Sequence, residues 1–420
     1  MKKAILFALC LFVTLSLKAA DIKQHIRKIS PTIEALYKDL HKHPEIAFQE
    51  IGTSKRFAKE LKALGFKVTE KVGGTGVVGV FRNGQGPTAW LRSEMDGLEI
   101  EEKTDWNFKS ASPGIMHGCG HDLHMASLIG TVSTLISMKD QWKGTLVVLG
   151  QPAEETLGGA KAMIKDGLFK RFPKPDYLLA FHNTGSFEAG QIAYREGQAY
   201  ASLDSVDIIV HGVGGHGSAP HGAVDPIVLA GKMIVGMQTL ISRNVPQTEP
   251  AVFSFGSVQG GKVHNVIPDK VHLKGTIRSF KPEVQQVIKK GIVRQAKKLA
   301  EAEGAPPPQV IFSQTNTSVF NDPEIAAELT PVFKKIVGSK NVIRRNPILA
   351  SEDFAQYPLA IRRPAFMFWI GVRPAKPGKN WGSNHNPYFA PDYKKTLPIA
   401  MESLVSAVLH LQKTKTSTTH

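Results

Sequence analysis

The sequence is poor in cysteine, in long apolar runs and in clustered charge. Its 420 residues include two cysteines, Cys10 and Cys119, which excludes a disulfide-stabilised scaffold. Beyond residue 20 no apolar run approaches the roughly 20 residues that span a bilayer. The formal net charge is +16, yet basic residues occur in pairs such as Arg344-Arg345 and form no run of five. A scattered basic surface of this kind argues against a nucleic-acid-binding protein.

The first twenty residues have the pattern of a secretory signal peptide. Two lysines precede an apolar run over residues 4–17, and alanines at 19 and 20 offer a cleavage site. The alternative is an uncleaved membrane anchor, for which the apolar run is short. We therefore predict an exported protein, periplasmic or secreted, with no stable membrane span after cleavage. Cys10 would be removed with this segment, so Cys119 would be the single cysteine of the mature chain.

Periodicity along the chain predicts an α/β protein. Apolar residues repeat at helical spacing over residues 22–40, and Ser30-Pro31 within them predicts a break or a new helix start. The segment HPEIAFQE, residues 43–50, leads to a second amphipathic stretch. Apolar strands then alternate with helical patterns, which predicts a mostly parallel sheet with helices on its faces.

The pattern changes between residues 200 and 316. There the expected order of elements is β-α-β-β-α-β, which is that of a ferredoxin-like α+β sandwich. We predict that this second domain is inserted into the first. The predicted organisation is a signal peptide at 1–20, a first catalytic part at 21–199, the inserted domain at 200–316 and a second catalytic part at 317–420.

Residues with metal-binding chemistry follow the predicted strands or, for Cys119 and His121, stand at the start of a predicted helix. Because sites in an open parallel sheet form outside the carboxyl ends of its strands, these residues are expected to converge at one edge. A thiolate with imidazoles suits zinc, and carboxylates also accept manganese. The set is too large for one structural zinc, whereas a pair of metals would use it. The residues are Asp96, Cys119, His121, Glu154, Glu155, His182 and His385.

Other interpretations of these residues exist. A lone Cys-x-His pair is more often part of a core than of a site, and adjacent glutamates are usually solvated. Cys119 as a covalent nucleophile is a rival to Cys119 as a metal ligand. The zinc-protease pattern HExxH and the deaminase pattern PCxxC are both absent.

Taken together, the motifs resemble those of the two-metal amidohydrolases and exopeptidases that include aminoacylases, hippurate hydrolases and auxin-conjugate hydrolases. The resemblance covers nearly the whole mature chain, and motifs in this order and spacing are highly specific. They are LRSEMDGLEI, MHGCGHDLHMA, QPAEETLGGAKAMIKDG, FHNTG, GVGGHGSAPHGAVDPI, NVIPDKVHLKGTIRSF, SEDFAQY and NHNPYF.

The resemblance implies a role for each candidate residue. Two divalent metal ions, Mn²⁺ or Zn²⁺, would be bound by Cys119, His121, Glu155, His182 and His385, and Asp96 would support these ligands from behind. Glu154 would be the general base. The inserted domain would mediate homodimerisation, and its His216 would reach the partner's active site to stabilise the oxyanion. Asn265 and Arg278 would hold the carboxylate of a small-molecule substrate.

Some positions admit a plainer interpretation or depart from the family pattern. His216 can simply cap a glycine-rich turn, Arg278 can be a surface charge, and His117 and His124 are expected to be supporting or structural. Departures from the family pattern are Glu94 where aspartate is usual, Glu99 where proline is usual, FHNTG without the usual tryptophan-proline, and NHNPYFAPD around His385.

The leading functional hypothesis is hydrolysis of the amide bond in N-acyl amino acids through a metal-activated water. The alternative within the same chemistry is a carboxypeptidase- or dipeptidase-like exopeptidase. An alternative from another class is a non-catalytic envelope protein that binds small carboxylates or metal.

Overall fold

The computed structural model describes the backbone of residues 2–416 and the side chains of residues 21–415. The predicted signal peptide, residues 1–20, lies outside the side chains described. The chain divides into two compact units. Unit 1 comprises Met1–Gly197, Asn321–Asn346 and Gln356–His420, and unit 2 comprises Gln198–Phe320 and Pro347–Ala355. The predicted domain bounds at residues 200 and 316 stay a prediction.

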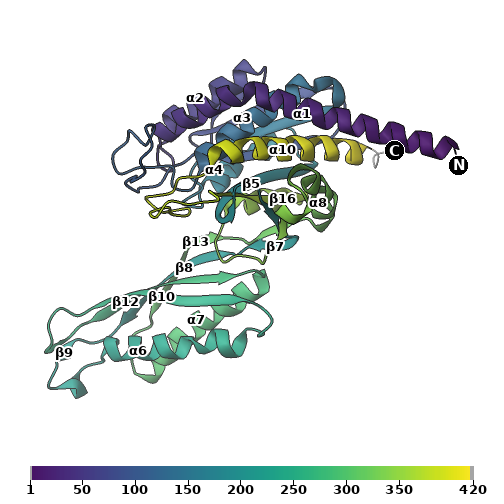
Figure 1. The fold of residues 1–420 in the computed structure, drawn as a ribbon. Helices are drawn as coiled ribbons and strands as arrows, with labels where there is room; N and C mark the ends of the chain where they lie inside the picture. Colours follow the sequence, from purple (N-terminus) through teal and green to yellow (C-terminus); the bar gives the residue numbers. More distant parts are fainter. Residues whose placement is uncertain (1, 417–420) are drawn as a thin grey trace. The chain divides into compact units, whose positions relative to one another are not determined.

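Unit 1 is built on an eight-stranded sheet (Figure 1). Its four central strands, in the order β4, β3, β5 and β16, are mutually parallel, while β1, β2 and β6 join in antiparallel fashion. The predicted mostly parallel sheet is therefore confirmed. In sheet order the strands are β1 (Lys67–Val72), β2 (Gly76–Asn83), β4 (Gly144–Gln151), β3 (Thr88–Glu94), β5 (Tyr177–Glu188), β16 (Ala365–Arg373), β6 (Ile192–Tyr194) and β15 (Val342–Arg344).

Helices α1, α3 and α10 pack against one another, and their apolar faces share one core with the sheet. Strand β4 is buried along its whole length, as expected for a central parallel strand covered on both faces. The helices of unit 1 are α1 (Lys2–Lys42), α2 (Ile51–Ala63), α3 (His121–Ser137), α4 (Gly159–Lys165), α5 (Leu168–Arg171), α8 (Pro323–Val337), α9 (Gln356–Ile361) and α10 (Tyr393–Thr416).

The predicted break at Ser30-Pro31 is wrong, because α1 continues through Pro31. Proline removes one backbone donor from a helix, but burial of the apolar face of α1 outweighs that loss. Ile26 and Ile33, which flank the proline, are both almost fully buried in the core. The hydroxyl of Ser30 donates to the Ile26 carbonyl at 2.7 Å.

Unit 2 contains the predicted β-α-β-β-α-β order. Its four-stranded antiparallel sheet has the order β10, β12, β8, β13, and α6 and α7 pack on it over a core of its own. The elements are β8 (Leu203–His211), β9 (Gly215–His216), α6 (Pro226–Met237), β10 (Ala251–Gly260), β11 (Val266–Ile267), β12 (Lys270–Ser279), α7 (Pro282–Ala302) and β13 (Gln309–Asn316). A separate two-stranded sheet pairs β7 (Gly197–Tyr200) with β14 (Val319–Asn321).

Among the residues that the structure describes, no helix combines the length and the apolar character needed to cross a membrane.

Candidate active site

The candidate site of unit 1 lies where its parallel strands end. Asp96 follows β3, and the Glu154-Glu155 turn follows β4. His182 lies on β5, and His121 is the first residue of α3. Helix α3 begins after Gly120, whose φ is 90°, and a Cβ at this glycine would come within 2.3 Å of the Asn183 amide. The sequence therefore needs glycine here to bring Cys119 and His121 against β5.

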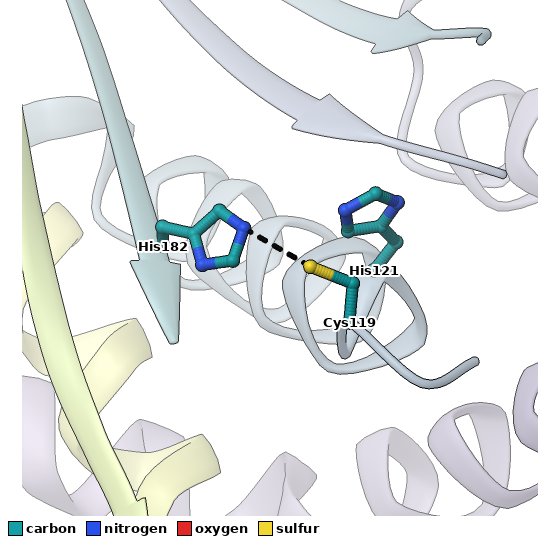
Figure 2. Close-up of side chains that lie close together, drawn as sticks. All are labelled: Cys119, His121 and His182. Carbon is teal, nitrogen blue, oxygen red and sulfur yellow. Dashed lines mark hydrogen bonds between the residues drawn. The ribbon is translucent and has the colours of Figure 1, made fainter. Parts of the chain in front are cut away.

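Cys119 lies among imidazoles rather than alone in a core. Its Sγ is 3.4 Å from His182 Nε2 and 3.3 Å from His385 Nε2. Figure 2 shows the sulfur pointing toward His182, with the His121 ring beside it. The donor atoms of Cys119, His121 and His182 all lie within 4.8 Å of one another. One thiol and three imidazoles are thus brought together from segments far apart in the sequence.

Hydrogen bonds orient two of these rings. His121 Nδ1 lies 2.8 Å from the Asp96 carbonyl oxygen and 3.2 Å from Asp96 Oδ1, so it carries the proton and donates. His182 Nδ1 likewise donates to the Asn183 carbonyl at 2.6 Å. Each bond turns Nε2 toward the centre of the site, where it can bind a cation once it carries no proton. This second contact is typical of metal-ligating histidines.

Two adjacent carboxylates complete the cluster. Glu155 Oε1 lies 3.4 Å from His385 Nε2 and 3.9 Å from His121 Nε2, and Glu154 Oε2 lies 3.8 Å from His121 Nε2. Burial opposes ionisation of Glu155, but the neighbouring His385 and His121 lower its pKa. Glu155 is therefore an anion placed between imidazoles.

His385 is held by its backbone. Its φ is +65°, a left-handed conformation that a non-glycine residue seldom adopts, and its N–H donates to the Gly118 carbonyl at 2.8 Å. Half of its side chain remains exposed. The strain is thus located at a residue of the cluster, where such strain is commonly found.

The cluster fits a divalent cation. The buried His121 Nε2 and Glu155 Oε1 have no hydrogen-bond partner among the described residues, although buried polar atoms normally have one. Burial raises the pKa of the Cys119 thiol, and the carboxylates of Glu155 and Glu154 raise it further. For His121 burial acts to lower the pKa, but the bond to Asp96 and nearby carboxylates raise it to about 10. A cation would satisfy the orphaned atoms and replace these protons.

Unit 2 carries the remaining predicted residues. His216 on β9 is exposed and pairs with Val266 of β11, and its Nδ1 accepts from the Ser218 hydroxyl at 2.8 Å. Asn265 is exposed, and its carbonyl accepts the Gly217 N–H at 2.8 Å, so it lies beside His216. Arg278 on β12 is half-buried, its pKa is lowered by burial, and its guanidinium has no hydrogen bond or ion pair among the described residues. The roles predicted for the three stay predictions.

No role was predicted for two side-chain amides that the structure places at the cluster. Asn183 Nδ2 and Asn384 Nδ2 both donate to the Cys119 carbonyl, at 2.6 and 3.0 Å, and Asn384 Nδ2 also contacts Asn183 Oδ1 at 2.9 Å. Each asparagine is a sequence neighbour of a predicted ligand, His182 or His385. That adjacency is the signal that identifies them.

The buried residues Glu94, His117 and His124 lie next to the histidines of the cluster. Glu94 is fully buried, pairs with Arg92 and accepts from His124 Nδ1 at 2.7 Å. His124 Nε2 accepts the Asn183 N–H at 2.9 Å, and burial lowers the pKa of His124 to about 4. His117 is buried, and neither of its ring nitrogens has a partner among the described residues. Glu99 is exposed.

A parallel sheet whose strand ends gather a thiol, imidazoles and carboxylates defines a metal-dependent hydrolase class. The profile of peptidase family M20/M25/M40 matches residues 90–410. The thermostable carboxypeptidase 1 of Saccharolobus solfataricus is 35% identical over 375 residues, covering 88% of this chain and 93% of its own. The hippurate hydrolase of Campylobacter jejuni is 38% identical over 328 residues, covering 76% and 83%.

A solved structure from Bacillus subtilis, described as a dinuclear metal-binding peptidase of the M20 family, has a TM-score of 0.77. It is 28% identical, and the match covers 92% of this chain and 99% of that chain. The chain therefore belongs to peptidase family M20/M25/M40. It is a metal-dependent hydrolase of amide bonds, as the sequence motifs predicted.

Proposed function

We propose that the protein hydrolyses the amide bond of N-acyl amino acids and releases the free amino acid. The observation that carries the proposal is that the adjacent residues Glu154 and Glu155 occupy different positions at the cluster. Glu155 lies between His385 and His121, in the position of a ligand, while Glu154 faces the cluster from the side of His121. The similarity to a hippurate hydrolase supports an acylated amino acid as the substrate.

Two divalent cations, Mn²⁺ or Zn²⁺, would be held by Cys119, His121, Glu155, His182 and His385. The similarity to a dinuclear metal-binding peptidase and the mixed sulfur, nitrogen and oxygen donors support this number and these metals. When bound, such cations supply Lewis acidity that polarises an amide carbonyl and acidifies water. Asp96 would hold the His121 ring in the orientation that presents Nε2.

Glu154 would move the protons of the reaction. Its carboxylate would accept a proton from the attacking water and pass it to the leaving amine, which must be protonated to depart. General acid–base catalysis of this kind typically contributes about 10²- to 10⁴-fold in rate. Covalent attack by Cys119 is disfavoured, because the buried thiol has a raised pKa and lies among carboxylates.

The residues of unit 2 would recognise the substrate. A half-buried guanidinium without a partner among the described residues suits a free carboxylate, since its planar fork matches two oxygens. Arg278 and Asn265 would bind the carboxylate of the amino acid. His216 would donate to the developing oxyanion, and loss of such a donor typically costs about 10²- to 10³-fold in kcat.

The chain would act as an exported homodimer. Apolar side chains exposed on unit 2, among them Val235, Val258 and Val266, support an interface there. The composition of residues 1–20 supports export to the periplasm or the medium. Light scattering of the chain from Asp21 tests whether it is a dimer. Fractionation of cells making the full chain tests whether it is exported.

The test of the proposed function is release of free amino acid from a panel of N-acyl amino acids and dipeptides. The chain from Asp21 is reconstituted with Mn²⁺ or Zn²⁺ and compared with Glu154→Gln. Metal-dependent release that falls at least a hundredfold in Glu154→Gln, with metal content unchanged, supports the proposal. Full activity of Glu154→Gln would refute the assignment of the base.

Exopeptidase activity is the second candidate, favoured by the similarity to a carboxypeptidase. The same panel separates the two, because its dipeptides report the exopeptidase reaction and its N-acyl amino acids report the amidohydrolase reaction. Membership in a family of hydrolases and the presence of Glu154 argue against the non-catalytic binding protein.

A further inference from the structure

The segment HPEIAFQE, residues 43–50, supplies none of the donor atoms described above, yet it ends in a buried carboxylate. The Glu50 side chain is fully buried before α2, where an anion without partners is costly. Its Oε1 accepts the Ala153 N–H at 2.8 Å, and the Thr75 hydroxyl donates to Oε2. Ala153 directly precedes Glu154. The buried Glu50 carboxylate therefore binds the first residue of the turn that carries both glutamates of the site.

That turn is strained and depends on outside contacts. Ala153 has a φ of +51° and Leu157 a φ of +55°, and both are left-handed conformations that cost energy for residues other than glycine. The Ala153 carbonyl closes the turn by accepting from Gly158 N–H at 3.2 Å. On the other side of the glutamates, the Glu155 N–H donates to Asp96 Oδ2 at 3.0 Å. The backbone at both ends of the glutamate pair is therefore bonded to a buried carboxylate: the Ala153 N–H to Glu50 and the Glu155 N–H to Asp96.

We propose that Glu50 is a positioning residue that fixes the turn presenting Glu154 and Glu155 to the reaction centre. It acts through the Ala153 amide and touches neither substrate nor metal. Without this acceptor the Ala153 N–H would be buried unpaired, and the turn would relax away from its strained conformation. The catalytic part of the proposal rests on the proposed function of Glu154, whereas the part concerning Glu155 rests on metal binding.

The same segment contains a matched control. The Glu45 carboxylate also accepts two backbone N–H groups, from Gly52 at 3.0 Å and Thr53 at 2.8 Å. These bonds begin α2 and do not involve the turn at residues 153–158. The side chains of Glu45 and Glu50 therefore have similar structural roles, but only that of Glu50 bonds to the turn. The Glu45 backbone carbonyl, which accepts the Gly97 N–H at 2.7 Å, is retained in Glu45→Ala.

The experiment compares Glu50→Ala, Glu50→Gln and Glu45→Ala in the chain from Asp21. In Glu50→Ala, kcat at saturating metal is expected to fall about ten- to a hundredfold with KM unchanged, because misplacement by about 1 Å can cost a hundredfold. Glu50→Gln keeps an oxygen for the Ala153 N–H and is expected to restore kcat to within about threefold. Glu45→Ala lowers the melting temperature but leaves kcat unchanged.

Calorimetric titration of the metal-free variants with Mn²⁺ or Zn²⁺ gives a second readout that needs no turnover. Loss of a residue that supports ligands typically weakens metal affinity about 10- to 100-fold, so Glu50→Ala is expected to weaken one binding step by that factor. Wild-type kcat and wild-type metal affinity in Glu50→Ala would overturn the proposal, as would an equal loss in Glu45→Ala. Should the wild type hydrolyse nothing in the panel, the proposed function fails, and the titration alone decides the role of Glu50.

Discussion

His41, at the end of α1, is a cation buried between two carboxylates. Its Nδ1 lies 2.7 Å from Asp122 Oδ2 and its Nε2 lies 3.2 Å from Glu102 Oε1, and all three side chains are buried. Burial alone lowers the pKa of His41, but its bonds to Asp122 and Glu102 raise it to about 9. The triad ties α1 to the first turn of α3, which carries His121.

The substitution His41→Gln tests how much this triad stabilises the fold. Because the pKa is about 9 in the folded chain and 6.5 in an unfolded one, protonation of His41 favours folding by about 3 kcal/mol. A raised pKa means that this contribution is complete below pH 6.5 and is lost as the pH rises through 9. Removing the cation also leaves Asp122 and Glu102 buried without it, a change that typically costs about 3–5 kcal/mol.

The assay is urea unfolding of the wild type and His41→Gln at pH 6 and pH 10. The difference in unfolding free energy between the two proteins is expected to shrink by about 3 kcal/mol from pH 6 to pH 10. His43→Gln is the control, because the His43 side chain two residues away is 62% exposed and should be dispensable. A difference that stays constant with pH would show that His41 is not charged in the folded protein.

Three further outcomes are expected. Asp96→Asn is expected to weaken metal affinity about 10- to 100-fold in a calorimetric titration, because it disturbs the bonds that orient His121 and Glu155. Unchanged affinity would contradict this role of Asp96. Arg278→Lys is expected to raise KM for substrates with a free carboxylate but not for their amides, because lysine lacks the planar guanidinium fork. An equal rise in KM for both kinds of substrate would exclude carboxylate recognition by Arg278. Removal of metal by a chelator lowers the melting temperature measured by calorimetry, and adding Mn²⁺ or Zn²⁺ restores it; identical melting curves would mean that no metal was bound.

The residue types and the strand ends predicted that these side chains converge, whereas the roles assigned to them came from the resemblance and stay predictions. Asp96, Glu154 and Glu155 each follow a strand of the sheet, so their convergence with His121 follows from parallel strands meeting at one edge. Short-range signals were less dependable. Pro31 predicted a break in α1, but burial of the helix face, a tertiary effect that the local sequence does not display, keeps the helix continuous.

What the sequence could not predict is the set of contacts that fixes the ligands. Glu50 and Ala153 are about a hundred positions apart, and the hydrogen bond between them depends on a strained turn with no glycine at its start. The same holds for Asn384 and Asn183, whose amides meet only when the last loop folds back onto β5. Such contacts carry no periodic pattern, so only the folded backbone reveals them.

The choice of neutral amides for this last contact has an electrostatic reason. Glu154, Glu155 and Glu94 already surround Cys119 and raise the pKa of its thiol. An ionised carboxylate could not donate to the Cys119 carbonyl, and a charged Lys or Arg donor would place positive charge beside a cation, whereas Asn183 and Asn384 bond to this carbonyl without adding net charge. The negative charge of the centre is thereby confined to groups that can face a cation. Buried negative charge of this kind is unfavourable without a cation, and the same charge makes the binding of a divalent metal favourable.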